Sequence, residues 1–116
     1  MYNIYTVKKH FLCRILFWKG GNNCMMYHYM TLADETEIVH SHLKEENNGK
    51  TVLVHFERPK IGGFDSARIS LPSYEWIMRD GFTDEEIKEF EEYSARHAHN
   101  LFYYAEIGGI PIAKAV

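Results

Sequence analysis

The stretch FTDEEIKEFEEYSARHAHNLFYYAEIGG, residues 82–109, contains the signals that decide the fold. Thr83 is followed three residues later by Glu86, which is the spacing of a capping box: the hydroxyl accepts a backbone N–H of the first turn, and the carboxylate accepts the N–H of the N-cap residue. Gly108 stands where many helices end in the left-handed conformation that glycine adopts without strain. We therefore expect one long helix from about Thr83 to Ile107.

The same stretch carries apolar or small residues at intervals of three or four, the spacing that places side chains on one face of an α-helix. These residues are Ile87, Phe90, Ser94, Ala98, Leu101 and Ala105. Because most of a helix's stability in a protein comes from packing such a face, this helix needs a second layer to cover. We expect that layer to be a β-sheet whose strands precede the helix in the sequence.

Five segments before the helix have the composition, or the alternation of apolar and polar residues, that is typical of β-strands. They are Phe11–Trp18, Cys24–Leu32, Thr36–Leu43, Thr51–Arg58 and Ser66–Leu71. Pro59 is expected to end ladder pairing because proline has no N–H to donate. Pro72 suits the first turn of a helix, so a short helix is expected over about Ser73–Arg79.

These elements predict an α+β fold: a four- or five-stranded antiparallel sheet, the short helix, and the long C-terminal helix packed on one face. A chain of 116 residues has the size of one domain, so the prediction is a single α+β domain over residues 1–116. Val52, Val54 and Phe56 alternate along one strand and are expected to form the face that the long helix covers.

Charge is unevenly distributed along the chain, although its net value is only −3. Residues 1–30 hold four bases and no acid, whereas residues 31–116 hold all 16 acids and nine bases. A net negative charge is unlike a nucleic-acid-binding protein, which usually carries a basic patch. No stretch approaches the roughly 20 apolar residues of a membrane span. The two cysteines, Cys13 and Cys24, have no CxxC spacing, and this usage fits a cytoplasmic protein.

One group of residues could carry chemistry if the third and fourth strands form a hairpin. Asn48-Gly49 is a strong two-residue hairpin signal. A turn centred there brings together four side chains of one sheet face: His40, His42, His55 and Glu57. Side chains directly opposite one another have Cβ atoms about 4.5–5.5 Å apart, and imidazoles with a carboxylate are ligands for Zn²⁺ or a similar divalent metal. This register predicts a metal site and, with it, a metal-dependent enzyme.

Two other interpretations of this group stay open. If the long helix covers the opposite face, the same residues belong to the polar, solvated face of an antiparallel sheet. Alternatively, they form a pH-sensitive or partner-binding histidine cluster, because imidazole titrates near neutral pH. The sequence has no nucleophile-elbow, phosphate-loop or zinc-protease motif, so apart from such a divalent metal no cofactor is expected.

The predicted helix also presents an acidic surface, with Asp or Glu at six of the nine positions from 84 to 92. Pairs at i,i+4 between Lys88 and Glu92, and between Glu92 and Arg96, would neutralise part of this surface. Otherwise it is a docking surface for a basic partner. The partner-binding residues predicted on this basis are Glu85, Glu89, Glu92 and Tyr103.

These observations favour a small, non-catalytic interaction or regulatory protein that binds a protein partner through the acidic helix, an aromatic patch or an exposed sheet face. Small antitoxins and phage-encoded inhibitors are built in this way, by analogy of fold alone. A nucleic-acid or membrane partner is not expected, whereas an exposed edge strand offers a route to a homodimer. The alternative function is the metal-dependent enzyme with its histidines on the open sheet face.

Overall fold

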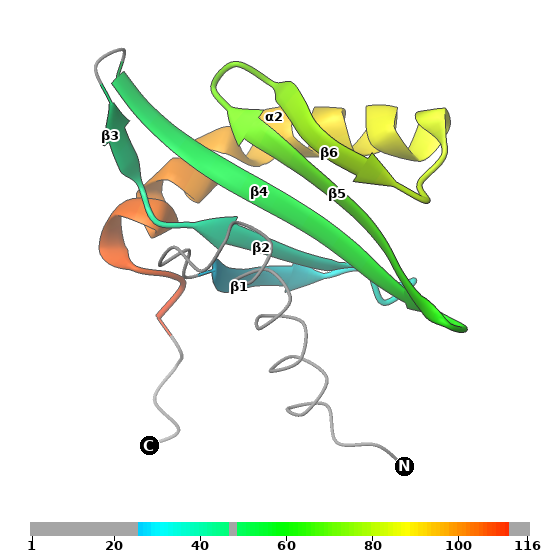
Figure 1. The fold of residues 1–116 in the computed structure, drawn as a ribbon. Helices are drawn as coiled ribbons and strands as arrows, with labels where there is room; N and C mark the ends of the chain where they lie inside the picture. The colour runs from blue at the N-terminus through cyan, green and yellow to red at the C-terminus, as the bar shows by residue number, and fades with distance from the viewer. Residues whose placement is uncertain (1–25, 47–48, 112–116) are drawn as a thin grey trace, which may run out of the picture.

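The computed structural model describes residues 26–46 and 49–111, which form an antiparallel sheet with one long helix against it (Figure 1). The elements are β1 (Met26–Thr31), β2 (Glu37–Ser41), β3 (Lys44–Glu46), β4 (Gly49–Lys60), β5 (Gly63–Leu71), β6 (Glu75–Asp80) and α2 (Asp84–Ile107). The predicted α+β class and the long C-terminal helix on one sheet face are confirmed. The predicted strand Phe11–Trp18 lies outside the described residues.

Strands β1, β2, β4, β5 and β6 lie side by side in that order, and each is antiparallel to its neighbours. The short strand β3 pairs with the first residues of β4. With its 12 residues, β4 is the longest of these strands, and it pairs with β2, β3 and β5. Its alternation of side chains therefore sets the two faces of the whole sheet.

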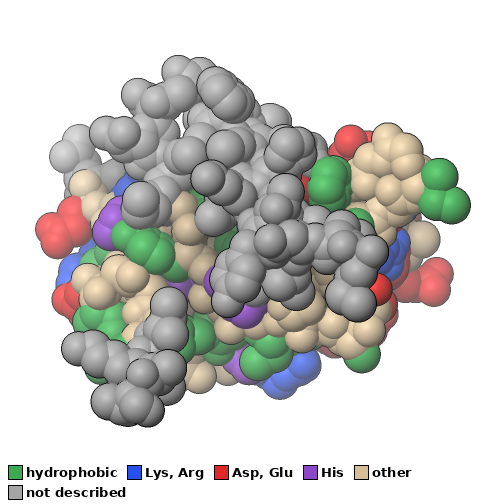
Figure 2. Space-filling model, turned by 90° about the horizontal axis from the view of Figure 1, so that it is seen from below, with side chains coloured by type: hydrophobic (Ala, Val, Ile, Leu, Met, Phe, Trp, Pro, Cys, Tyr) green, Lys and Arg blue, Asp and Glu red, His purple; other side chains and the backbone are tan. Residues whose placement is uncertain are grey.

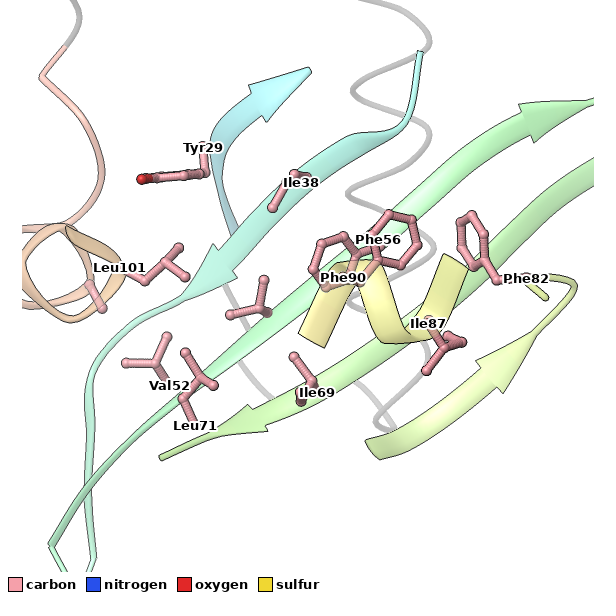
Figure 3. Close-up of a cluster of buried hydrophobic side chains, with 13 residues drawn as sticks. Tyr29, Ile38, Val52, Phe56, Ile69, Leu71, Phe82, Ile87, Phe90 and Leu101 are labelled. Carbon is pink, nitrogen blue, oxygen red and sulfur yellow. The ribbon is translucent and has the colours of Figure 1, made fainter. Parts of the chain in front are cut away.

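The hydrophobic core lies between α2 and one face of the sheet (Figure 3). The sheet contributes Val52, Val54 and Phe56 from β4 and Ala67, Ile69 and Leu71 from β5, all fully buried. The rings of Phe56 and Phe90 lie nearly parallel, with centroids 4.3 Å apart and planes 9° apart. The expected orientation is thus confirmed, because α2 covers the face that carries Val52, Val54 and Phe56.

Both termini of α2 are capped by the predicted residues. The Glu86 N–H donates to Thr83 Oγ1 at 3.1 Å, and the Thr83 N–H donates to Glu86 Oε1 at 2.9 Å, which completes the capping box. Gly108 adopts the left-handed conformation with φ 87° and donates its N–H to the Tyr104 carbonyl. Within residues 26–46 and 49–111, no helix is both long and apolar enough to span a membrane.

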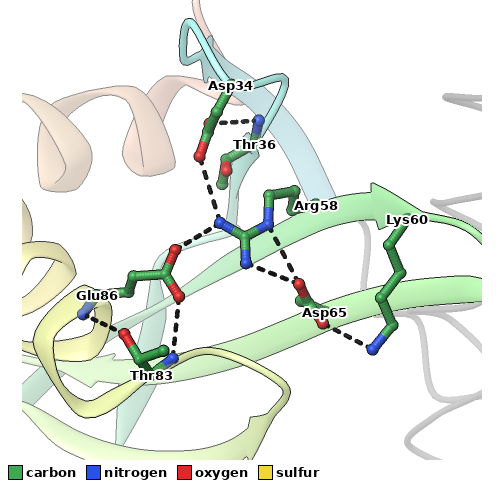
Figure 4. Close-up of polar contacts among 7 residues, drawn as sticks. All are labelled: Asp34, Thr36, Arg58, Lys60, Asp65, Thr83 and Glu86. Carbon is green, nitrogen blue, oxygen red and sulfur yellow. Dashed lines mark hydrogen bonds and ion pairs between the residues drawn. The ribbon is translucent and has the colours of Figure 1, made fainter.

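The N-terminal end of α2 is attached to the sheet by the guanidinium of Arg58 on β4 (Figure 4). Arg58 donates to Glu86 of the capping box at 2.5 Å and to Asp65 of β5 at 2.8 and 3.2 Å. A longer contact of 3.4 Å reaches Asp34 in the β1–β2 turn. The guanidinium also lies 4.8 Å from the centre of the Phe82 ring, a cation–π distance. Four separate parts of the chain are therefore held by one cation.

The segment expected to form a short helix over Ser73–Arg79 is instead strand β6, so that prediction is wrong. Trp76 pairs with Ile69 and packs against Phe56, with ring centroids 6.1 Å apart. The turn before it is closed by a Tyr74 N–H that donates to the Ser70 carbonyl at 2.8 Å. A two-turn helix is only marginally stable on its own, whereas the open edge of β5 supplies a hydrogen-bonding partner for every second residue.

Pro59 does not end strand pairing as expected, because β4 continues to Lys60 and Pro59 stands opposite Phe64. The pairing of β2 with β4 ends at the pair of Glu37 and Glu57. Among the described strands, β4 therefore has a neighbour on one side only at Pro59, and a residue without an N–H is tolerated there.

We predict that Arg58→Met lowers the free energy of unfolding by about 2 kcal/mol, because Asp65 and Glu86 lose charge-assisted hydrogen bonds while the aliphatic stem is kept. Urea denaturation measures the change. Arg79→Met is the matched control, since its ion pair with Asp84 is exposed, and it should change stability by less than about 0.5 kcal/mol. Equal losses in the two variants would show that Arg58 does not hold α2 to the sheet.

Candidate functional site

The side of α2 that faces away from the sheet carries a continuous row of exposed side chains. Successive residues of an α-helix are rotated by about 100° around its axis, and the row consists of the residues that lie within about 40° of one line along the helix. We call it the outer stripe: Glu85, Glu89, Glu92, Arg96, His99, Tyr103 and Ile107, all exposed. The buried residues Ile87, Phe90, Ser94, Leu101 and Ala105 lie on the opposite side of the helix. All four predicted partner-binding residues are thus brought onto one face.

The N-terminal half of the outer stripe is acidic and is not neutralised by the described part of the chain. Glu85, Glu89 and Glu92 form no ion pair among residues 26–46 and 49–111, so the expected pairs of Glu92 with Lys88 and Arg96 are not formed there. Three bases that do form pairs, Arg58, Lys60 and Arg79, contact other carboxylates. Their partners are Asp34, Asp65, Asp84 and Glu86.

The C-terminal half of the outer stripe is apolar and aromatic. Tyr103 is 54% exposed and Ile107 is 46% exposed, although each is large enough to fill a pocket in a partner. The helix therefore changes along its length from carboxylates to exposed hydrophobic surface.

A groove of about 290 Å³ opens beside the acidic half of the outer stripe. It lies between the β1–β2 turn and α2 and is lined by Leu32, Ala33, Asp34, Glu86, Glu89 and Phe90. Glu89 belongs both to the groove and to the outer stripe. The groove combines apolar walls with three carboxylates, a lining that suits the stem and head of a lysine or arginine side chain.

The four residues predicted to form a metal site do not converge. His40 pairs with Val54 across β2 and β4 and lies on the face covered by α2, whereas His55 and Glu57 lie on the other face. His42 lies beyond the end of β2. In the part of the chain that the structure describes, no three His, Cys, Asp or Glu side chains are placed to hold a metal ion.

The physical reason is the register of the hairpin. β3 pairs with β4 so that Glu45 stands opposite Lys50 and Glu46 opposite Gly49, which centres the connection on residues 47–48 and not on Asn48-Gly49. Between β3 and β2 the register changes by one further residue. Because side chains alternate between faces, the resulting odd shift moves His40 to the face opposite Glu57.

His55 and Glu57 take part in a buried polar chain on the sheet face opposite α2. Arg68 Nε donates to His55 Nδ1 at 3.3 Å, so the neutral imidazole carries its proton on Nε2 and donates it to Glu57 Oε1 at 3.0 Å. The Ser66 hydroxyl donates to the same Glu57 oxygen at 2.9 Å. All four side chains are buried, so the expectation of a solvated polar face is wrong for them. The serine hydroxyl is directed to Glu57 and not to the imidazole, which is unlike a nucleophile–base pair.

Histidines also take part in a second group, which lies between the strands β1 and β2 and the middle of α2. We call it the Tyr–His cluster: Tyr27, Tyr29, His40, His42, Tyr93 and His97. Tyr29 Oη lies 2.7 Å from His97 Nδ1, and Tyr27 Oη lies 2.5 Å from His42 Nε2. The Tyr93 and His97 rings are stacked at 4.1 Å. Histidines also reach the molecular surface, where the space-filling view shows them beside hydrophobic side chains (Figure 2).

His40 is the most buried member of this cluster, with no exposed surface. Its Nδ1 lies 3.0 Å from the Ser41 carbonyl oxygen, which can only accept, so Nδ1 carries the proton. Nε2 is then a lone-pair acceptor, and it has no hydrogen-bond partner among residues 26–46 and 49–111. Burial lowers the pKa of His40 and of His97, and burial raises the pKa of Tyr93 to about 12. His40, His97 and Tyr93 are therefore neutral at pH 7.

The Tyr–His cluster could not be predicted from the sequence because its members are up to 70 residues apart in the chain. The alternation in β1 does place Tyr27 and Tyr29 on one face, and that was the available signal. It could not show that this face meets His97, since that contact depends on where α2 ends on the sheet.

Comparison of the chain with models of protein families, with curated proteins and with solved structures finds no match.

We predict that His40 is neutral at pH 7.5 and carries its proton on Nδ1, the nitrogen nearest the Ser41 carbonyl. Long-range ¹H–¹⁵N NMR correlations of the imidazole rings distinguish the two tautomers. His55 is the internal comparison, because its hydrogen bonds require the proton on Nε2. A His40 ring protonated on Nε2 at this pH would contradict the geometry.

Proposed function

We propose that this protein is a non-catalytic interaction module of the cytoplasm that binds a basic protein partner through the outer stripe of α2. The observation that carries the proposal is the row of three exposed carboxylates, at Glu85, Glu89 and Glu92, that no base in the described part of the chain neutralises. An array of like charges on a rigid helix costs stability through self-repulsion. A complementary partner relieves this repulsion and is attracted over about 8 Å at physiological ionic strength.

The spacing along α2 describes the partner. At 1.5 Å per residue, Glu85 and Glu92 are about 10 Å apart, and Tyr103 lies about 16 Å further along the helix. A partner segment with basic residues at one end and an apolar residue at the other matches this order. Exposed tyrosine is also enriched at the energetic centres of protein interfaces.

The size of the surface indicates a weak, reversible contact. A helix of 24 residues is about 36 Å long, and with a width of about 10 Å its outer side offers about 360 Å². A stable complex of standard size buries about 800 Å² on each partner. The outer stripe alone therefore suits a peptide-sized segment and a regulatory, transient complex.

The arrangement of the buried His55–Glu57 chain supports a non-catalytic role. The Ser66 hydroxyl is bonded to Glu57, and the four side chains of that chain are buried. General acid–base or nucleophilic catalysis needs a group that reaches the substrate.

The test is selection of peptides from a displayed random library by the full-length protein at 50 mM and at 300 mM salt. The wild-type protein should enrich peptides with a basic run and an apolar residue. Reversing three charges, with Glu85→Lys, Glu89→Lys and Glu92→Lys, should weaken the binding of the selected peptides about tenfold, since each exposed pair contributes about 0.2–1 kcal/mol. Tyr103→Ala should weaken them by a similar factor.

The matched control reverses three other exposed acids, with Glu45→Lys, Glu75→Lys and Asp80→Lys. This variant has the same net charge as the first, so a non-specific charge effect would weaken both equally. Equal loss in the two variants, or enrichment of peptides without basic residues, would contradict the outer stripe as the docking surface.

A further inference from the structure

The two ends of α2 are attached to the sheet by interactions of different chemistry. At the N-terminal end, Glu86 is held by Arg58 and by the Thr83 N–H. The hydrogen bond from Arg58 lowers the pKa of Glu86 below its ordinary value, and hydrogen bonds from Lys60 and Arg58 lower the pKa of Asp65. These carboxylates therefore stay ionised in mild acid, and this attachment does not change between pH 7.5 and 5.5.

The C-terminal end of α2 is attached to β1 and β2 by neutral groups. The Leu43 N–H donates to the Ala105 carbonyl at 3.2 Å, and the Tyr29 hydroxyl oxygen lies 2.7 Å from His97 Nδ1. Gly109, just beyond the helix, packs so closely on Tyr27 that an added Cβ would lie 2.9 Å from a carbon of its ring. Only glycine fits at this contact, because its φ of 104° is also disfavoured for other residues.

His40 lies next to this C-terminal attachment, and its Nε2 atom faces no hydrogen-bond acceptor among the described residues. The Tyr27 ring lies 5.7 Å and the Tyr29 ring 6.2 Å from the imidazole. A proton on Nε2 would add a charge and a donor at a fully buried atom that has no acceptor among the described residues. Leaving such a donor unpaired costs far more than leaving a lone pair unpaired, because the ring is then charged.

The groups around His40 provide little stabilisation for a positively charged imidazole. Tyr27 and Tyr29 face it from β1, His42 follows it along the chain, and Val54 stands opposite on β4. From α2, three titratable side chains contact Tyr29, and they are Tyr93, His97 and Tyr104. His42 opposes a charge on His40. No carboxylate among the described residues is a cause of the shift in the pKa of His40.

We propose that protonation of His40 releases the C-terminal half of α2 from β1 and β2, so that mild acid regulates the outer stripe. The Tyr103–Ile107 end of the stripe would then lose its fixed position, while the acidic end remains held by Arg58. The effect of this release on partner binding rests on the proposed function. The release itself is a property of the protein alone.

The direction follows from proton linkage. The pKa of His40 in the attached state lies below the ordinary value of 6.5, so the released state binds the proton more tightly. The attachment is fully stabilised above pH 6.5 and weakens as the pH falls below 6.5 toward the lowered pKa. One such group changes the equilibrium by at most about tenfold between pH 7.5 and 5.5.

The experiment is amide hydrogen exchange of the full chain at pH 7.5 and 5.5, corrected for the intrinsic effect of pH on exchange. In the wild-type protein, protection of residues 98–107 should fall severalfold, and at most about tenfold, at pH 5.5, whereas protection of residues 86–91 should not change. In His40→Phe, which keeps an aromatic ring but cannot titrate at this position, protection of residues 98–107 should depend on pH much less than in the wild-type protein. His99→Phe, which replaces an exposed imidazole of α2, is the control and should keep the pH dependence of the wild-type protein.

Three outcomes would overturn the proposal. They are an equal loss of protection in both halves of α2, no loss in the wild-type protein, and an unchanged pH dependence in His40→Phe. If His40→Phe fails to fold, the His40 imidazole resonances of the wild-type protein decide instead. Their titration must coincide with the loss of protection, and a midpoint that differs from it by more than one pH unit excludes His40. No partner is present in these measurements, so their failure leaves the docking surface to be judged by the peptide selection.

Discussion

The stacking of Phe90 on Phe56 sets the position of α2 on the sheet. Both rings are buried, and their centroids are 4.3 Å apart. Because residues alternate between the two faces of β4, this contact requires Val52 and Val54 to face α2 and His55 and Glu57 to face the other way. The rotation of the helix about its axis follows as well, since Phe90 can reach Phe56 only if the outer stripe points away from the sheet. The exposure of Glu85, Glu89 and Glu92 is thus a consequence of core packing.

The helix could be predicted closely because its signals are local. The Thr83–Glu86 capping box, the 3.6-residue period and Gly108 each act within a few residues, and all are found in the structure. The positions of β1, β2, β4 and β5 were also within reach, because alternation is a local pattern. The segment from Ser73 to Arg79 was not, since an open strand edge 5 to 14 residues away in the chain decided its conformation.

The predicted metal site is wrong because it depended on the register of the strands, for which the sequence contains only a weak signal. The turn lies one residue before the predicted position, which moves each cross-strand partner by two positions. The register changes by one further residue between β3 and β2, so the total shift is three, an odd number that exchanges the faces of the strand. His40 was therefore assigned to the wrong face. Its partners in the structure, Tyr27 and Tyr29, come from a strand that the turn signal does not concern. The earlier alternative of a pH-sensitive histidine cluster remains as a proposal, but with a different set of histidines.

The central claim is that α2 is held on this sheet face in one orientation by Phe56 and Phe90. A double-mutant cycle with Phe56→Leu, Phe90→Leu and the double variant, followed by urea denaturation, measures the coupling of the two rings directly. The stacked geometry predicts a coupling free energy of about 1 kcal/mol beyond the individual losses. Losses that add to within about 0.3 kcal/mol would contradict the contact, and with it the orientation of the outer stripe.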